Sequence, residues 1–68
     1  MINGTDIAAM RRALGLSQTE LGQKLGGLHQ GSVSRLERGK TKPRGLVLTA
    51  LQALMAEADA RATREEAA

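Results

Sequence analysis

The chain of 68 residues contains no cysteine, no aromatic residue and only one proline. Without cysteine, neither a disulfide nor a thiolate metal site can form, and a reducing compartment is compatible with this composition. Without Phe, Trp or Tyr, the hydrophobic core must consist of Leu, Ile, Val, Met and Ala side chains. The fold therefore has to be stabilised by the burial of aliphatic side chains.

Long apolar runs are absent as well. No segment approaches the roughly 20 residues that span a bilayer, and residues 1–4 are not typical of a signal peptide. We therefore expect a single soluble, cytoplasmic domain over residues 1–68 without a membrane partner. The chain is too short for a large catalytic core, and no nucleophile stands beside a base, so we expect neither an enzyme nor a cofactor.

Positive charge is concentrated in the middle of the chain. Ten Lys and Arg against seven Asp and Glu give a formal charge of +3. Eight of the ten basic residues lie between positions 11 and 44, with only Glu20 and Glu37 as acidic residues there. Such a segment suits a polyanion such as nucleic acid. Charge alone leaves open the alternative of a solvated basic surface without a partner.

Residues 17–38 predict two short helices joined by a glycine-containing turn. Ser17 is a good N-cap and Glu20 follows three residues later, which predicts a capping box. Gly26 and Gly39 are placed to end the two helices. Apolar residues at helical spacing point inward from both: Leu21, Leu25, Val33 and Leu36. The pattern predicts a helix-turn-helix, whose second helix usually lies in the major groove of DNA.

Another helix is expected before this motif, over about residues 6–14, with Asn3 or Thr5 as its N-cap. Its inward stripe consists of Ile7, Met10 and Leu14. Arg11 lies at the edge of this stripe and needs an anionic partner, for which Glu37 is the natural candidate. A free surface arginine is the alternative.

Gly22 and His29 occupy less usual positions in the motif. A glycine inside a helix costs ~1 kcal/mol relative to alanine, so Gly22 predicts a close crossing of the two helices, with a neutral surface glycine as the alternative. The Leu28 side chain is expected to pack into the hydrophobic core. His29, the only histidine, has no Cys or second His beside it, which argues against a metal site and favours an N-cap or a phosphate contact.

The outer face of the helix over residues 30–38 is small, polar and basic, with no acidic side chain. Arginine pairs bidentately with guanine, glutamine pairs with adenine, and serine serves either base. We therefore expect this face to contact base edges, with Arg35 as the main contact. The loop over residues 39–44 carries Lys40, Lys42 and Arg44, which suit DNA phosphates.

Residues 45–64 contain no proline and no glycine after the first position, which predicts one long helix. Its core stripe consists of Val47, Leu51, Leu54 and Ala58. Leu48, Met55 and Ala62 widen this stripe and predict a homodimer interface. Alternatively, Leu48 and Met55 only complete the monomer core. Residues 63–68 are expected to fray.

The chain resembles the lambda-repressor-like helix-turn-helix regulators of the Cro/CI type, also called the XRE family. The resemblance covers about residues 7–54 and rests on MRRALGLSQTELGQKLG, VSRLERGKTKP and the apolar last helix. It implies an all-α domain of four to five helices with a long C-terminal helix, bound to double-stranded DNA. It also implies an ion pair between Arg11 and Glu37. The residues implied to face base edges are Gln30, Gly31, Ser32, Ser34 and Arg35. Those implied or expected to contact phosphates are Gln18, Thr19, His29, Arg38, Lys40, Lys42 and Arg44.

Two departures from the family pattern affect this comparison. Gly27 is one residue more than relatives usually have between the two helices of the motif, and the last helix is unusually long.

From the sequence as a whole we expect a homodimeric repressor on a palindromic operator, with its recognition helices ~34 Å apart. The alternatives are an antitoxin-type module that neutralises a protein partner and represses its own operon, and a helical adaptor without DNA affinity.

Overall fold

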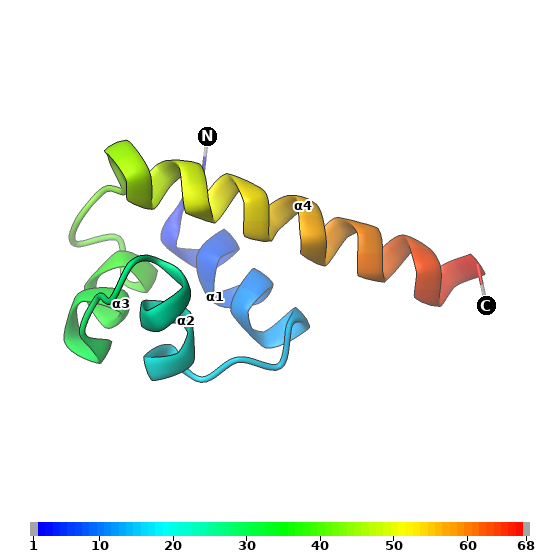
Figure 1. The fold of residues 1–68 in the computed structure, drawn as a ribbon, viewed down its shortest axis with the longest axis horizontal. Coiled ribbons are helices and arrows are strands. Elements are labelled where there is room, and N and C mark those ends of the chain that lie inside the picture. The colour runs from blue at the N-terminus through cyan, green and yellow to red at the C-terminus, as the bar shows by residue number, and fades with distance from the viewer. Residues whose placement is uncertain (1, 68) are drawn as a thin grey trace.

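The computed structural model describes the backbone of residues 2–67 and the side chains of residues 2–63. Within residues 2–67 the chain is all-helical, as predicted, and forms no strand. Its helices are α1 (Gly4–Ala13), α2 (Gln18–Lys24), α3 (Gln30–Glu37) and α4 (Gly45–Ala67). In Figure 1, α4 runs along one side of the molecule above α1, while α2 and α3 lie below the N-terminal half of α4.

Side-chain caps determine where the first two helices begin. Asn3, rather than Thr5, caps α1, because its Oδ1 accepts the Asp6 N–H at 2.8 Å. The predicted capping box of α2 is present: Ser17 Oγ accepts the Glu20 N–H at 3.0 Å, and Glu20 Oε1 accepts the Ser17 N–H at 2.8 Å. The hydrogen bond that the Ser17 backbone N–H donates to the carboxylate, with a further contribution from the Ser17 hydroxyl, holds the pKa of Glu20 below its ordinary value. α3 differs, since its N-cap residue His29 makes no side-chain capping bond.

The turn between α2 and α3 explains the glycine inside α2. A Cβ at Gly22 would overlap the carbonyl oxygen of Leu28 and would lie 3.4 Å from Val33 Cγ2. The crowding predicted at Gly22 therefore comes first from the turn and only second from α3. The Gly22 carbonyl accepts the N–H groups of Gly27 at 3.0 Å and Leu28 at 2.9 Å, which closes the turn. Gly26 and the additional Gly27 both have positive φ, at 89° and 91°.

The core draws one fully buried side chain from each helix: Ile7, Leu21, Val33 and Leu51. Around them lie further buried residues, which are Ala8, Met10, Leu25, Leu36, Leu54 and Ala58. All except Ala8 were predicted from helical spacing. Leu14, Leu28 and Val47 are half-buried and pack against this cluster. Aliphatic side chains from all four helices thus meet in one core, as the lack of aromatic residues requires.

The last helix is continuous, as predicted, and its C-terminal end projects beyond the other three helices (Figure 1). Its backbone is helical through Ala67. A frayed tail was expected over residues 63–68. The side chains of residues 64–67 and the whole of residue 68 lie outside the described part of the chain. Among the described helices, none combines the length and apolar character required to cross a membrane.

Candidate nucleic-acid interface

α3 presents a polar and cationic face to solvent. Val33 and Leu36 are buried, which turns the opposite side of the eight-residue helix outward. Gln30, Gly31 and Arg35 are exposed on this side. Ser32 and Ser34 are half-buried beside them. A Cβ at Gly31 would meet no atom within 4 Å, so the backbone of α3 is open to close approach there.

Arg35 is positioned by its own helix. Its Nη2 donates a hydrogen bond to Ser32 Oγ at 3.4 Å, one turn earlier. Its guanidinium nevertheless stays exposed, with its other donors free of hydrogen bonds to described residues. Arg38, the C-cap residue of α3, is exposed as well. A fork of N–H donors held in this way suits the two acceptors on a guanine edge or a phosphate.

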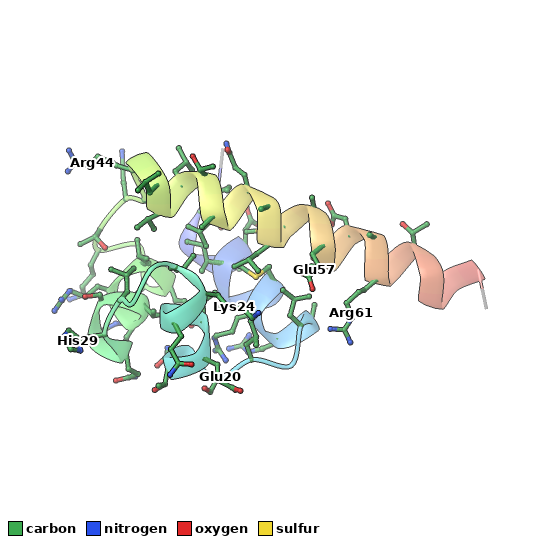
Figure 2. All side chains as sticks on the ribbon, in the orientation of Figure 1. Glu20, Lys24, His29, Arg44, Glu57 and Arg61 are labelled. Carbon is green, nitrogen blue, oxygen red and sulfur yellow. The ribbon has the colours of Figure 1, made fainter. Side chains whose placement is uncertain are left out.

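The basic loop after α3 borders this face. Lys40, Lys42 and Arg44 are all exposed. A hollow of about 210 Å³ separates α3 from the loop, and its cationic lining consists of Arg35, Lys42 and Arg44. Figure 2 shows the labelled Arg44 and His29 at the α3 end of the molecule, whereas Glu57 and Arg61 lie along the C-terminal part of α4. Unbalanced positive charge is thus gathered at one end of the domain.

Behind α3, an ion pair ties the first helix to the third. Arg11 Nε lies 2.6 Å from Glu37 Oε2, and Arg11 Nη2 lies 3.3 Å from Glu37 Oε1. The side chains are only 15% and 8% exposed. Arg11 Nη1 also donates to the Leu16 carbonyl at 3.0 Å, just before α2 begins. This is the pairing expected from the sequence, and it excludes the free surface arginine.

Glu37 is ionised in this setting. Burial of its carboxyl group raises its pKa, but the hydrogen bonds from Arg11 and Gln18, with the charges of Arg11 and Arg12, outweigh this effect. The net result is a pKa below the ordinary value. A charged carboxylate is therefore present directly behind the exposed face of α3.

Gln18 extends this cluster to the front of α3. Its Nε2 donates to Glu37 Oε1 at 3.1 Å, and its Oε1 accepts a hydrogen bond from Gln30 Nε2. The family resemblance implies a phosphate contact for Gln18, but it does not reveal that Gln18 joins Glu37 to Gln30. The only sequence signal is its position as the first residue of α2, directly after the N-cap.

The other expected phosphate contacts lie around the same face. Thr19 and His29 are both exposed, at the start of α2 and immediately before α3. Together with the loop they border α3 on several sides. Gln18 is half-buried and already hydrogen-bonded within the protein.

The three residues expected at a dimer interface share one side of α4. Met55 is half-buried and packs against the core, whereas Ala62 is exposed. Both line a hollow of about 410 Å³ between α4 and α1, whose other walls include Ala9 and Ala13. Leu48 is half-buried at a second hollow, of about 440 Å³. Met55 therefore contributes to the monomer core without being covered by it.

Two short helices joined by a tight turn, with the second displaying a polar cationic face beside a basic loop, define a small helical DNA-binding domain. A family model described as helix-turn-helix matches residues 7–55, which reach from α1 into α4. The chain therefore belongs to the lambda-repressor-like, XRE-type helix-turn-helix family of DNA-binding transcriptional regulators, a regulatory rather than an enzymatic family. Comparison of this chain with the curated proteins and with the solved structures found no match.

Proposed function

We propose that this regulator is a repressor that binds a palindromic operator as a homodimer, with α3 of each copy in the major groove. The observation that carries the proposal is the exposed face of α3, where the Arg35 guanidinium is exposed beside the Ser32 hydroxyl and no acidic side chain lies on that face. The residues assigned to base edges are Gln30, Gly31, Ser32, Ser34 and Arg35. Arg35 carries most of the discrimination, because a bidentate arginine contact to guanine distinguishes it from the other bases by ~1 to 3 kcal/mol.

Phosphate contacts hold α3 in its register on the DNA. The residues assigned to them are Gln18, Thr19, His29, Arg38, Lys40, Lys42 and Arg44. The three cations of the loop do most of this, since they are exposed beside α3. Such contacts add affinity without selecting a sequence, and each one releases counterions from the DNA. Affinity is therefore expected to fall steeply with salt.

A homodimer supplies the specificity that one copy lacks. α3 has eight residues and offers few side chains to bases, so a monomer reads too short a site for tight, selective binding. Two copies related by a two-fold axis read two half-sites about one helical turn apart. We assign the contact between copies to Leu48, Met55 and Ala62, whose side of α4 borders the two hollows described above.

Fluorescence anisotropy on the DNA upstream of the chain's own gene, with scrambled DNA as control, tests this function at several salt concentrations. The native fragment should bind more tightly than the scrambled one. Arg35→Ala should remove the difference, because it removes a base contact. Lys42→Gln should weaken binding to both and reduce the salt slope by about one unit. Equal binding to both fragments would leave only phosphate attraction, and absence of binding would contradict the function.

A protein partner is the second candidate, as in an antitoxin that also represses its own operon. Leu46, at the start of α4, is 88% exposed, and the hollow between α1 and α4 is lined mainly by apolar residues. A partner protein could cover these surfaces. Size-exclusion chromatography with light scattering separates the candidates, because a stable dimer of the chain alone favours the self-sufficient repressor.

A further inference from the structure

We propose that the hollow of about 440 Å³ beside the N-terminal part of α4 binds an aliphatic carboxylate, and that the bound carboxylate draws Lys42 away from DNA. Such a ligand weakens the binding of the regulator to DNA. The inference rests on the proposed function, because it takes Lys42 to contact a phosphate. It assigns a small-molecule site to the DNA-binding domain itself.

Three segments that are distant in the sequence line this hollow. They are residues 2–4 at the start of α1, the loop after α3, and the N-terminal part of α4. Leu36, a buried residue of the core, also lines it. A Cβ at Gly4 would overlap the Glu37 carbonyl oxygen, so the start of α1 already lies on the backbone at the end of α3 and cannot move closer to fill the space. The volume falls in the range of ~300 to 1,000 Å³ that is usual for sites of small organic ligands.

The side chains around the hollow define the chemical class of its ligand. Its apolar surface comes from Ile2, Leu36, Pro43 and Leu48, which suit an aliphatic chain because contact removes both surfaces from water. Lys42 is the one charged side chain among the described residues of the lining, which include no acid. A single exposed ammonium matches an anionic head group that carries one charge. A carboxylate therefore suits the site better than a doubly charged phosphate.

Lys42 connects this hollow to the DNA-binding face. It also lines the smaller hollow of about 210 Å³ between α3 and the loop, together with Arg35 and Arg44. Thr41 and Pro43 line both hollows as well, so the loop separates one from the other. The flexible four-carbon stem of a lysine lets its ammonium turn to either side. When the ammonium pairs with a ligand carboxylate, a DNA phosphate loses that contact.

The loss of one phosphate contact is distinguishable from other effects of a ligand. It weakens binding to native and scrambled DNA by the same factor and lowers the salt slope, as Lys42→Gln does. Leu48 lines the hollow and also belongs to the proposed contact between copies. Dissociation of the dimer would instead reduce the preference for the native fragment, and it would not require Lys42.

Binding is first measured on the protein without DNA, with decanoate as the probe, below the concentration at which decanoate forms micelles. In a carbon–proton correlation spectrum, the methyl signals of Leu36 and Leu48 should shift until the site is saturated. The methyl signal of Met55, at the hollow between α4 and α1, should stay in place. Decylamine is the matched control, because it has a chain of the same length and a positive head group, and it should bind much more weakly.

The length of the chain tests the apolar part of the site. From hexanoate to octanoate to decanoate, affinity should rise by up to about fourfold for each added CH₂ group, because each one buries more apolar surface. In Lys42→Gln, decanoate should lose its advantage over decylamine.

The effect on DNA is then measured by fluorescence anisotropy at saturating decanoate. Decanoate should weaken the binding of the native chain to both fragments and should leave Lys42→Gln unchanged. Lys40→Gln is the matched control, since Lys40 is an exposed cation of the same loop but is not among the described residues that line the hollow. This variant should bind DNA more weakly and still respond to decanoate.

Three results would overturn the proposal: no saturable shift at Leu36 and Leu48, equal shifts with decanoate and decylamine, or a response to decanoate that persists in Lys42→Gln. Each of them would leave Arg35-dependent DNA binding, and with it the proposed function, intact. If the native chain bound no DNA, the proposed function would fail and the effect on DNA with it, whereas the methyl shifts would still decide whether the carboxylate site exists.

Discussion

At the scale of single residues, Gly22 lies where any side chain would meet the backbone of the turn that follows. A Cβ there would overlap the Leu28 carbonyl oxygen, which belongs to the backbone and cannot swing aside. We expect Gly22→Ala to lower the free energy of unfolding by about 2 kcal/mol or more, as overpacking of a close contact does. For a domain of this size that is a large fraction of the total, roughly 3–10 kcal/mol. Urea denaturation followed by circular dichroism measures it.

Gly31→Ala is the matched control for this prediction. Gly31 also lies inside a helix, but a Cβ there would meet nothing within 4 Å. Alanine should therefore stabilise α3 by up to ~1 kcal/mol through its higher helix propensity. If both variants gained stability, the crowding at Gly22 would not be the reason for its glycine.

Glu37 makes the stability of the domain depend on pH in a defined direction. Its pKa is lower in the folded state than its ordinary value of 4.5. Its contribution to stability is therefore fully present above pH ~4.5 and is lost as the pH falls through the folded-state pKa. We expect Glu37→Gln to be less stable than the native chain at neutral pH, with the difference shrinking below pH ~4.5.

Urea denaturation of both proteins between neutral and acid pH gives this difference. Subtracting the unfolding free energy of Glu37→Gln from that of the native chain at each pH cancels the titration of the other carboxyl groups, Glu20 included, because both proteins contain them. A difference that stays constant down to the acid limit would show that the ionised form of Glu37 is not what stabilises the ion pair.

At the scale of helices, α3 alone among the short helices lacks a side-chain cap. Asn3 and Ser17 cap α1 and α2, whereas His29 caps α3 only through its backbone. We expect His29→Asn and His29→Asp each to raise the free energy of unfolding by about 1 kcal/mol. His29→Asp should lower DNA affinity more than His29→Asn does, for all sequences alike, because it places a negative charge at the phosphate-facing start of α3.

Urea denaturation of the two variants measures the effect of the cap on stability, and fluorescence anisotropy measures the effect of the charge on DNA binding. Equal DNA affinity of the Asp and Asn variants would show that position 29 does not lie beside a phosphate. No gain in stability from either variant would mean that the first backbone N–H groups of α3 already have other hydrogen-bond partners.

Local signals were sufficient to predict the helices. Capping residues and apolar spacing depend on neighbours within about one helical turn. The capping box of Ser17 and Glu20 and the single long helix after residue 44 could therefore be predicted from the sequence. The pairing of Arg11 with Glu37 was predicted because Arg11 lies at the edge of the core stripe and needs an anionic partner. The hydrogen bond between Gln18 and Gln30 was not, since it depends on how closely α2 approaches α3. For the same reason the contact of Gly22 with the turn was misjudged.

At the scale of the whole molecule, the proposed dimer depends on one side of α4. Ala62 is exposed and lines the hollow with Met55, so a large charged residue there would obstruct a second copy without disturbing the monomer core. We expect Ala62→Arg to convert the dimer to a monomer, as measured by light scattering. Ala53→Arg is the matched control: Ala53 is also an exposed alanine of α4, but nine residues away, on the opposite side of the helix.

The two variants also connect assembly with DNA binding. Loss of the dimer removes the second half-site, so Ala62→Arg should bind the full operator much more weakly, although the added arginine itself favours attraction to DNA. Its preference for the correct half-site should remain, because α3 and the basic loop are untouched. Dimers that survive Ala62→Arg and dissociate in Ala53→Arg would place the interface on the opposite face of α4. A native chain that is monomeric at all concentrations tested would leave a different protein to complete the repressor.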